Sequence, residues 1–252
     1  MNPDAHAEAE QDLALAAELQ AALLPRTCPA GCPHQAVAAL NRMCGTVGGD
    51  FHDFIRLNDE QVAIVVGDVV GHGVRSSLLM AQIMGWLRSE HDRRARPMAV
   101  MTELNRMLIG LGERTSLVIP CSMIYMVIDG PTGACFFVNA GHPRPLLCDA
   151  AGCGLQMVGA RNILLGVEDI EFEEVCHTFE PGQRMILYTD GIIDAANPSD
   201  ERFGLERLRD VLKGLCPASP QQCAEAVFLA VADFRRDKPQ TDDETIVVVD
   251  RT

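Results

Sequence analysis

Four segments of this sequence combine a carboxylate with glycines or threonines at the end of an apolar run. They are Gly48-Gly49-Asp50-Phe51, Gly67-Asp68-Val69-Val70-Gly71-His72-Gly73, Tyr188-Thr189-Asp190-Gly191 and Thr241-Asp242-Asp243-Glu244-Thr245. A carboxylate at the end of a buried strand is partly desolvated, so an unpaired charge there is costly and needs a partner. No Lys or Arg lies within three residues of Asp50 or Asp68. The sequence therefore favours a partner that is not a neighbouring basic side chain.

Divalent cations shared among the four segments would be such a partner. Carboxylate oxygens are hard ligands that suit Mg²⁺ or Mn²⁺. Two such ions, roughly 3.5–4 Å apart, can hold a bridging water and clamp a phosphoryl group for in-line displacement. The alternative is that Asp-Gly is ordinary turn chemistry. That alternative is preferred for any single segment, but the four together favour a metal site.

Strands and helices that could position these carboxylates follow from the hydrophobic pattern. We expect strands over residues 35–42, 51–57, 62–70, 121–128, 134–139, 145–148, 171–179, 183–189 and 245–250, and helices over 5–24, 73–90, 98–111, 205–215 and 220–235. On the helix over 73–90, we expect one apolar face made of Leu78, Leu79, Ile83, Trp86 and Leu87. Short hairpin connections favour antiparallel sheets in an α+β fold over a doubly wound parallel sheet.

Composition excludes several classes of protein. The chain has 252 residues, with 35 acidic and 21 basic side chains and a formal charge of −14. This charge argues against binding nucleic acid or an anionic membrane surface. No apolar run is long enough to span a bilayer, and the acidic N-terminus lacks the basic region of a secretory signal, so a cytoplasmic location is expected. The ten cysteines are then expected to be reduced, several of them buried; a zinc site at Cys28, Cys32 and His34 is disfavoured.

Five segments occur in an order that is shared with a known family. They are GGDFHDF (48–54), VVGDVVGHG (65–73), NAGHPRPLL (139–147), LYTDGIIDA (187–195) and DDETIVVV (242–249). Together they resemble the PPM family of metal-dependent serine/threonine protein phosphatases. They are most similar to the bacterial branch typified by the sporulation stage II E phosphatase and the stress-response sigma-factor regulator phosphatases. The resemblance covers residues 18–250, and ELQAALLP (18–25) is similar to the helix that precedes the catalytic domain in that branch.

The resemblance implies a four-layer αββα sandwich with two antiparallel sheets and a preceding N-terminal helix. Residues 1–26 would form a helical extension with a regulatory or dimerisation role, and residues 27–252 the PPM-type phosphatase domain. Two Mn²⁺ or Mg²⁺ ions would bind at one edge of the sandwich. Their expected ligands are Asp50, Asp68, the carbonyl of Val69, Asp190 and one of Asp242 and Asp243. The family pattern favours Asp242 as the ligand and Asp243 as its support.

Some positions depart from the family pattern. Eukaryotic relatives carry a candidate general acid, a histidine, at the position of Val70, so no general acid is assigned; His72 could orient the turn instead. His52 replaces an aromatic residue, and a surface position is favoured over contact with substrate. Arg42 and Arg56 stay unassigned, since no early arginine matches the one that holds phosphate in the eukaryotic branch.

Structural roles are favoured for two further groups of residues. Asn139 and His142 are expected to hydrogen-bond and pack within a turn near the site. Four methionines at helical spacing are expected to fill the core, namely Met80, Met84, Met101 and Met107.

The expected function is hydrolysis of phosphoserine or phosphothreonine on a protein, without a covalent phosphoenzyme. The resemblance suggests a phosphorylated anti-anti-sigma (STAS-type) substrate in a partner-switching pathway. Alternatives are a phosphatase-fold binding module without turnover and a hydrolase of small phosphoesters. The stripe from Leu13 to Leu24 could form a homodimer or dock an activator, and Arg88, Arg93, Arg94 and Arg96 could receive an acidic partner.

Overall fold

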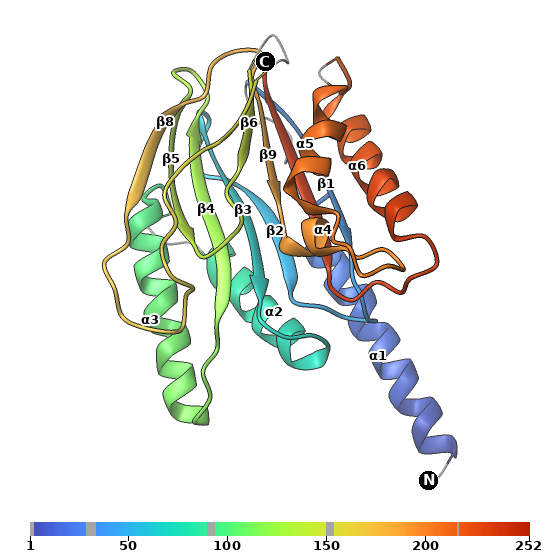
Figure 1. Ribbon diagram of the computed structural model, residues 1–252. Coiled ribbons are helices and arrows are strands. Elements are labelled where there is room, and N and C mark those ends of the chain that lie inside the picture. The colour runs from blue at the N-terminus through green and yellow to red at the C-terminus, as the bar shows by residue number, and fades with distance from the viewer. Residues whose placement is uncertain (1–2, 29–33, 90–93, 150–153, 216) are drawn as a thin grey trace.

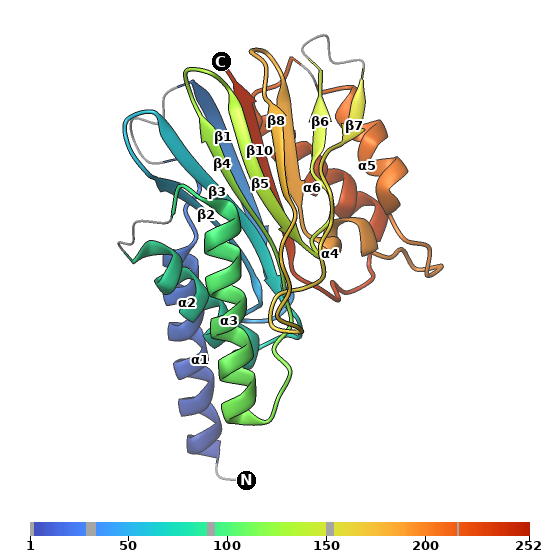
Figure 2. The same cartoon turned by 90° about the vertical axis from the view of Figure 1, so that its left-hand side faces the viewer.

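Two five-stranded antiparallel sheets lie face to face in the computed structural model, with helices outside both (Figure 1). The structure describes residues 3–28, 34–89, 94–149, 154–215 and 217–252. Figure 2 shows α1, α2 and α3 on one side of the sheets and α4, α5 and α6 on the other. The expected α+β fold with two antiparallel sheets is confirmed.

The first sheet has the strand order β1-β10-β9-β6-β7. Its strands are β1 (Gln35–Arg42), β10 (Glu244–Arg251), β9 (Arg184–Tyr188), β6 (Leu146–Cys148) and β7 (Leu155–Met157). Val247 and Val249 of β10 pack between the two sheets, whereas Ile246 and Val248 pack against the outer helices. The continuous β-branched run of β10 follows from burial on both faces.

The second sheet has the strand order β2-β3-β4-β5-β8. Its strands are β2 (Asp50–Arg56), β3 (Gln61–Val69), β4 (Cys121–Asp129), β5 (Ala134–Ala140) and β8 (Glu174–Thr178). The expected hairpin joins β2 to β3, and its register places Asp50 directly opposite Asp68. The hydrophobic pattern of this hairpin thus sets which two carboxylates become neighbours.

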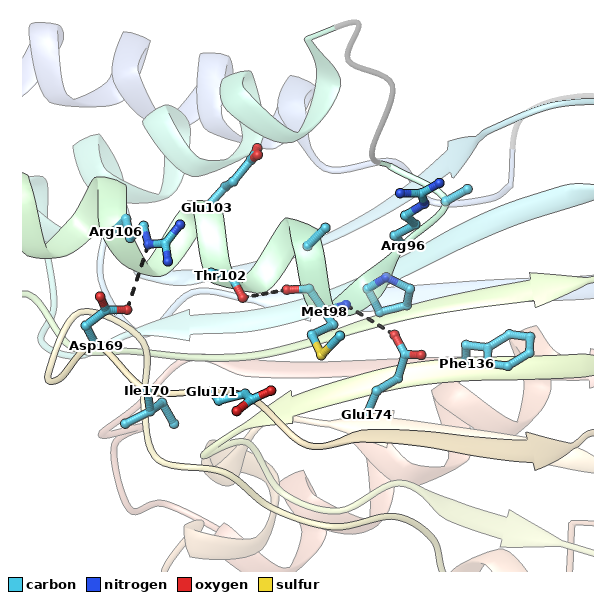
Figure 3. Close-up of a pocket in the computed structure, with 13 residues that line it drawn as sticks. Arg96, Met98, Thr102, Glu103, Arg106, Phe136, Asp169, Ile170, Glu171 and Glu174 are labelled. Atoms are coloured by element: carbon cyan, nitrogen blue, oxygen red, sulfur yellow. Dashed lines mark hydrogen bonds and ion pairs between the residues drawn. The ribbon is translucent and has the colours of Figure 1, made fainter.

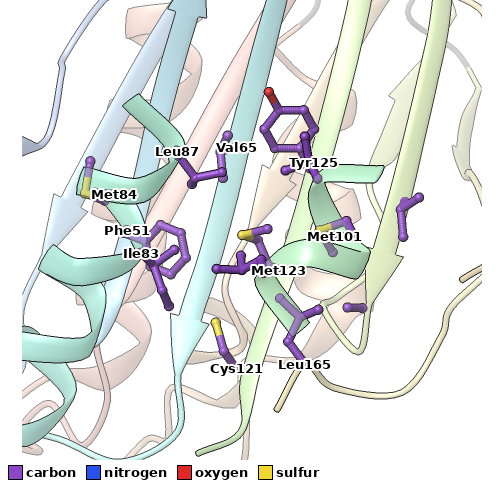
Figure 4. Close-up of a cluster of buried hydrophobic side chains, with 14 of the residues drawn as sticks. Phe51, Val65, Ile83, Met84, Leu87, Met101, Cys121, Met123, Tyr125 and Leu165 are labelled. Carbon is purple, nitrogen blue, oxygen red and sulfur yellow. The ribbon is translucent and has the colours of Figure 1, made fainter. Parts of the chain in front are cut away.

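Six helices in the described part of the chain cover the sheets or precede them. They are α1 (Pro3–Leu23), α2 (Val74–Arg88), α3 (Pro97–Thr115), α4 (Asp190–Asp194), α5 (Gly204–Lys213) and α6 (Pro220–Arg235). Side chains of α2 and α3 form a core with the second sheet. Figure 4 shows Ile83 beside Phe51, Leu87 beside Val65, and Met101 on the side of Met123. Met80, Met84 and Met101 are fully buried and Met107 is partly buried, so their expected role as core residues is confirmed.

The apolar face predicted for α2 is partly wrong. Its buried residues are Ser76, Met80, Ile83, Met84 and Leu87, while Leu78 is 67% exposed. At about 100° per residue, Leu78 points away from the stripe that Met80, Met84 and Leu87 present to the sheet. The sequence offered two overlapping apolar stripes, and packing against β2 and β3 selects the one that contains the methionines.

Two short elements were not expected, and one strand is shorter than expected. α4 and β7 have five and three residues, too few to show a period. β8 spans Glu174–Thr178 within the strand expected over 171–179.

The cysteines follow the expectation in part. Cys121 and Cys135 are buried thiols, whereas Cys28 is disulfide-bonded, so the expectation of reduced cysteines is wrong at that position. Cys32, which belongs to the disfavoured zinc spacing, lies outside the described residues. Within the described ranges, no helix has the length and apolar character to cross a bilayer.

Candidate metal centre

The predicted carboxylates come from strand ends of both sheets. Asp50 begins β2, and Asp68 lies opposite it near the end of β3. Asp190 begins α4, separated by one residue from the end of β9, and Asp242 and Asp243 directly precede β10, the strand beside β9. The structure therefore brings together, at the end of the sandwich near α4, the segments that the sequence placed far apart (Figure 1).

Asp50 is held by the hydroxyls of Thr189 and Thr245, for which the sequence predicted no role. Its Oδ2 accepts a hydrogen bond from Thr189 Oγ1 at 2.7 Å and another from Thr245 Oγ1 at 2.6 Å. The Thr245 hydroxyl also accepts from Nδ2 of Asn41 at 2.7 Å, and the Thr245 N–H donates to Thr189 Oγ1 at 3.0 Å. The network fixes one oxygen of a buried carboxylate and orients the other.

Asp243 and Asp242 differ in what they contact. Asp243 is buried; its Oδ1 accepts the N–H of Cys44 and its Oδ2 that of Gly49, both at 2.7 Å. Asp242 is exposed and accepts the N–H of Asp243 through Oδ1 at 2.9 Å. Both oxygens of Asp243 therefore hold the loop before Asp50, while Asp242 faces solvent at the site.

The carboxylates are destabilised as anions. Burial raises the pKa of Asp50 well above its usual value, and nearby Asp68 adds to the rise, although the threonine hydrogen bonds oppose it. Burial raises the pKa of Asp68 to about 7, with further contributions from Asp190, Asp242 and Asp243. Asp190 and Asp242 reach the surface, and partial desolvation by the surrounding protein raises the pKa of each. A nearby cation would reverse this, because it stabilises the charged form.

The oxygen atoms of these carboxylates and of the Val69 carbonyl are suitable ligands for a divalent cation, although the side chains are not yet arranged around one point. Across the described part of the chain, no three His, Cys, Asp or Glu groups already stand in a metal-binding arrangement. The Val69 carbonyl and Asp68 Oδ1 lie close to Gly49: a Cβ on Gly49 would come within 2.5 Å of the former and 3.2 Å of the latter. Glycine thus leaves room for these oxygen donors.

A side chain of the N-terminal helix reaches the same loop. Gln20 of α1 is buried; its Nε2 donates to the Gly48 carbonyl at 2.8 Å and its Oε1 accepts the Gly48 N–H at 3.0 Å. The helix is therefore tied to the backbone two residues before Asp50. A glutamine within an Ala/Leu/Glu-rich helix gives no sequence signal for such a contact.

The expectation of a surface position for His52 is wrong. His52 is 2% exposed, and its Nε2 lies 2.8 Å from the Pro25 carbonyl, because the chain that leaves α1 runs back over β2. Burial lowers the pKa of His52 to about 4. Arg88 is also structural, since its guanidinium binds Asp53 at 2.7 Å and the Leu23 carbonyl at 2.7 Å.

The remaining arginines named in the sequence analysis lie outside the group of carboxylates or outside the described residues. Arg93, from the proposed basic cluster, lies outside the described residues, and Arg96 lies at the start of α3. Arg56 pairs with Asp59 at 2.6 Å, and Arg42 lies 3.6 Å from Glu244. Both of these arginines therefore have carboxylate partners outside the predicted metal ligands.

Asn139 and His142 form the expected turn. Asn139 donates to the His142 carbonyl at 3.0 Å and accepts the His142 N–H at 2.8 Å. His142 Nδ1 lies 2.7 Å from Ser122 Oγ, and Ser122 is the register partner of Asp68. Burial lowers the pKa of His142 to about 3, so the ring is neutral, and it contacts the start of β4 beside the end of β3. His72 is exposed.

The sequence also matches known proteins. Residues 58–252 match the family described as Stage II sporulation protein E (SpoIIE). The phosphoserine phosphatase RsbP of Bacillus subtilis (strain 168) is 28% identical over 207 residues, which is 81% of this chain and 49% of RsbP. The chain thus spans about half the length of that relative.

Solved structures show the same fold. The SiaA-PP2C domain of Pseudomonas aeruginosa has a TM-score of 0.82 at 23% identity, covering 100% of both chains. The structure of RsbX in complex with magnesium has a TM-score of 0.63 at 15% identity, covering 87% of this chain and 96% of RsbX. With a family match over most of its length, the chain belongs to the SpoIIE family, and it has the fold of the SiaA-PP2C domain.

Proposed function

We propose that this chain is a metal-dependent protein phosphatase that hydrolyses phosphoserine or phosphothreonine. The observation that carries the proposal is the convergence of Asp50, Asp68, Asp190 and Asp242 at one end of the sandwich, with raised pKa values. The SpoIIE family match and the relative RsbP, which is named a phosphoserine phosphatase, support it.

Two Mg²⁺ or Mn²⁺ ions would be held by Asp50, Asp68, the Val69 carbonyl, Asp190 and Asp242. The presence of magnesium in the RsbX structure supports this choice of ion. When bound, such ions neutralise a phosphoryl group and lower the pKa of water. Thr189 and Thr245 would keep Asp50 oriented, and Asp243 would hold the loop that carries it.

The proposed substrate is a phosphorylated anti-anti-sigma (STAS-type) regulator of a partner-switching pathway, which would place the activity in the cytoplasm. Family membership and the relative RsbP support this choice. A serine-phosphorylated STAS protein should lose its phosphate in the presence of Mn²⁺, as measured by the mass of the intact protein.

The test of the activity compares wild type with Asp68→Asn in Mn²⁺ and in EDTA. We expect phosphate release from the phosphoprotein by wild type in Mn²⁺ and a loss of at least about 100-fold in the variant. Equal background rates would favour a binding module without turnover. Activity on a chromogenic ester, but not on phosphoprotein, would indicate a small-phosphoester hydrolase.

We also propose that α1 (within the extension 1–26) is a regulatory surface, for a second copy or an activator. Leu15 and Leu19 are 57% and 71% exposed, while Gln20 on the same helix holds Gly48. A partner that moves α1 would therefore act on the loop before Asp50.

Deletion of residues 1–20 tests this role through the mass in solution and the rate of phosphate release. Leu15→Ser with Leu19→Ser keeps Gln20 and so separates the surface from the loop contact. If neither the deletion nor the double variant changes the oligomeric state, the response to an activator or the rate, α1 has no regulatory role.

A further inference from the structure

A groove of about 820 Å³ lies on the outer side of the second sheet (Figure 3). One wall is the first turns of α3, with Met98, Thr102 and Arg106. The other is formed by Phe136 of β5 and by the segment 169–174, which includes Ile170 and Glu174. Helix, sheet and connecting segment thus enclose a space at the surface.

The floor of this groove is apolar and unusually exposed for its residue types. Met98 is 43% exposed and Phe136 is 39% exposed. Val138 and Ala140, which share the face of β5 with Phe136, are buried under the helices, so Phe136 continues that row past the cover of α3. A large aromatic side chain beside a flexible methionine is typical of a binding surface for apolar groups.

The rim of the groove is acidic. Among the described residues, four acidic side chains line it, namely Glu103, Asp169, Glu171 and Glu174, against the two basic side chains of Arg96 and Arg106, a formal balance of −2. The exposed ion pair between Arg106 and Asp169 has an N–O distance of 3.9 Å, and Glu174 accepts the Met98 N–H at 3.2 Å. An exposed pair at this distance contributes little to stability, so the Asp169 side chain is only loosely held. Glu168 and Glu173 extend the negative charge along the same segment. An acidic rim repels an anionic membrane and attracts basic side chains.

The groove is separate from the carboxylate site. Asp68 pairs with Ser122 of β4, whereas Phe136 pairs with Val127, five residues further along that strand. At about 3.4 Å per residue, the two levels of the sheet are about 17 Å apart. A ligand in the groove would leave the carboxylates uncovered.

We propose that this groove docks an extended segment of a partner protein that carries a large apolar residue next to basic residues. The apolar side chain would pack on Phe136 and Met98, where it removes both from water. Lysine or arginine side chains on either side would face Glu171 and the neighbouring carboxylates. These charge pairs would orient the bound segment and raise its rate of association. The site would serve recruitment of a partner, whether or not the chain hydrolyses phosphoproteins.

Selection from a library of random twelve-residue peptides displayed on phage, with the full chain as target, tests the proposal. We expect enrichment of peptides with Phe, Leu or Met flanked by Lys or Arg. Binding of a synthetic peptide from that pool, measured by fluorescence polarisation, should weaken at least tenfold in Phe136→Ser and at least fivefold in Glu171→Lys. It should also weaken as salt rises.

Leu229→Ser, at an exposed leucine of α6, is the matched control and should bind as wild type does. Circular dichroism and the Tm check that each variant is folded; Glu171 is exposed, so its variant keeps the test available if Phe136→Ser is destabilised. No enrichment, enrichment of acidic peptides, or equal affinity of Glu171→Lys and wild type would overturn the proposal.

Discussion

Replacement of Thr245 by Val should weaken metal binding without altering any proposed metal ligand. Valine has nearly the shape of threonine, but it cannot donate to Asp50 Oδ2, which the hydroxyl contacts at 2.6 Å, or accept from Asn41 at 2.7 Å. The Asp50 carboxylate is buried, so water does not readily replace the lost donor. Its charged form, which a cation requires, becomes less stable.

The size of the effect follows from the hydrogen bond that is lost. A hydrogen bond to a charged group contributes about 1.5–3 kcal/mol. Since about 1.4 kcal/mol corresponds to a factor of ten, the affinity for Mn²⁺ should fall about 10- to 150-fold. Groups that orient metal ligands change metal affinity by about 10–100-fold when mutated, which is the same range. Thr189→Val, which removes the second donor at 2.7 Å, should act in the same direction.

Isothermal titration calorimetry of the metal-free protein with Mn²⁺ measures this change in affinity. The control is Thr178→Val, at an exposed position of β8, which should bind as wild type does. The Tm of each metal-free variant checks that the fold is intact. An affinity of Thr245→Val within twofold of wild type would refute the reasoning that this hydroxyl holds Asp50 for a cation.

Other parts of the site lead to three further predictions. Gln20→Ala leaves the buried polar groups of Gly48 without their partner, so the free energy of unfolding in urea should fall by about 1–3 kcal/mol, while the exposed Glu18→Ala leaves it unchanged. Gly191→Ala should abolish phosphate release and Mn²⁺ binding, because its Cβ would overlap the Asp243 carbonyl; a variant as active as wild type would contradict this. The third concerns Asp68, whose pKa is raised from the ordinary value of 3.8 to about 7 in the folded protein, so the folded state binds more protons than the unfolded state between these two values. The free energy of unfolding of the metal-free protein should therefore rise as the pH falls from 8 towards 5, and Asp68→Asn should make this dependence on pH weaker. The same dependence in both proteins would exclude a raised pKa for Asp68.

The sequence predicts the fold well where one physical pattern dominates. The strands β3 and β10 are nearly continuous apolar runs bounded by turn residues, and α6 begins at a Pro after Ser219, which forms a capping box with Gln222. The failures occur where packing chooses between patterns, as on α2, where the methionine stripe and not Leu78 faces the sheet. α4 and β7 are too short to have a pattern.

The carboxylates of the site are predictable because each lies in a recognisable local segment. Their supporting residues are not, since the contacts from Asp50 to Thr189 and Thr245 span 139 and 195 positions of the chain. The contact from Gln20 to Gly48 depends on where α1 docks, which no local pattern specifies. His52 is buried for the same reason, because the chain near Pro25 covers it.

We propose above all that a pair of divalent cations binds to Asp50, Asp68, the Val69 carbonyl, Asp190 and Asp242. Crystals grown with Mn²⁺, with data collected at the manganese absorption edge, test it most directly. We predict two anomalous peaks, roughly 3.5–4 Å apart, with Asp242 in contact with one ion and Asp243 still bound to the N–H groups of Cys44 and Gly49. Peaks elsewhere on the molecule, or a metal bound through Asp243 in place of Asp242, would contradict the account.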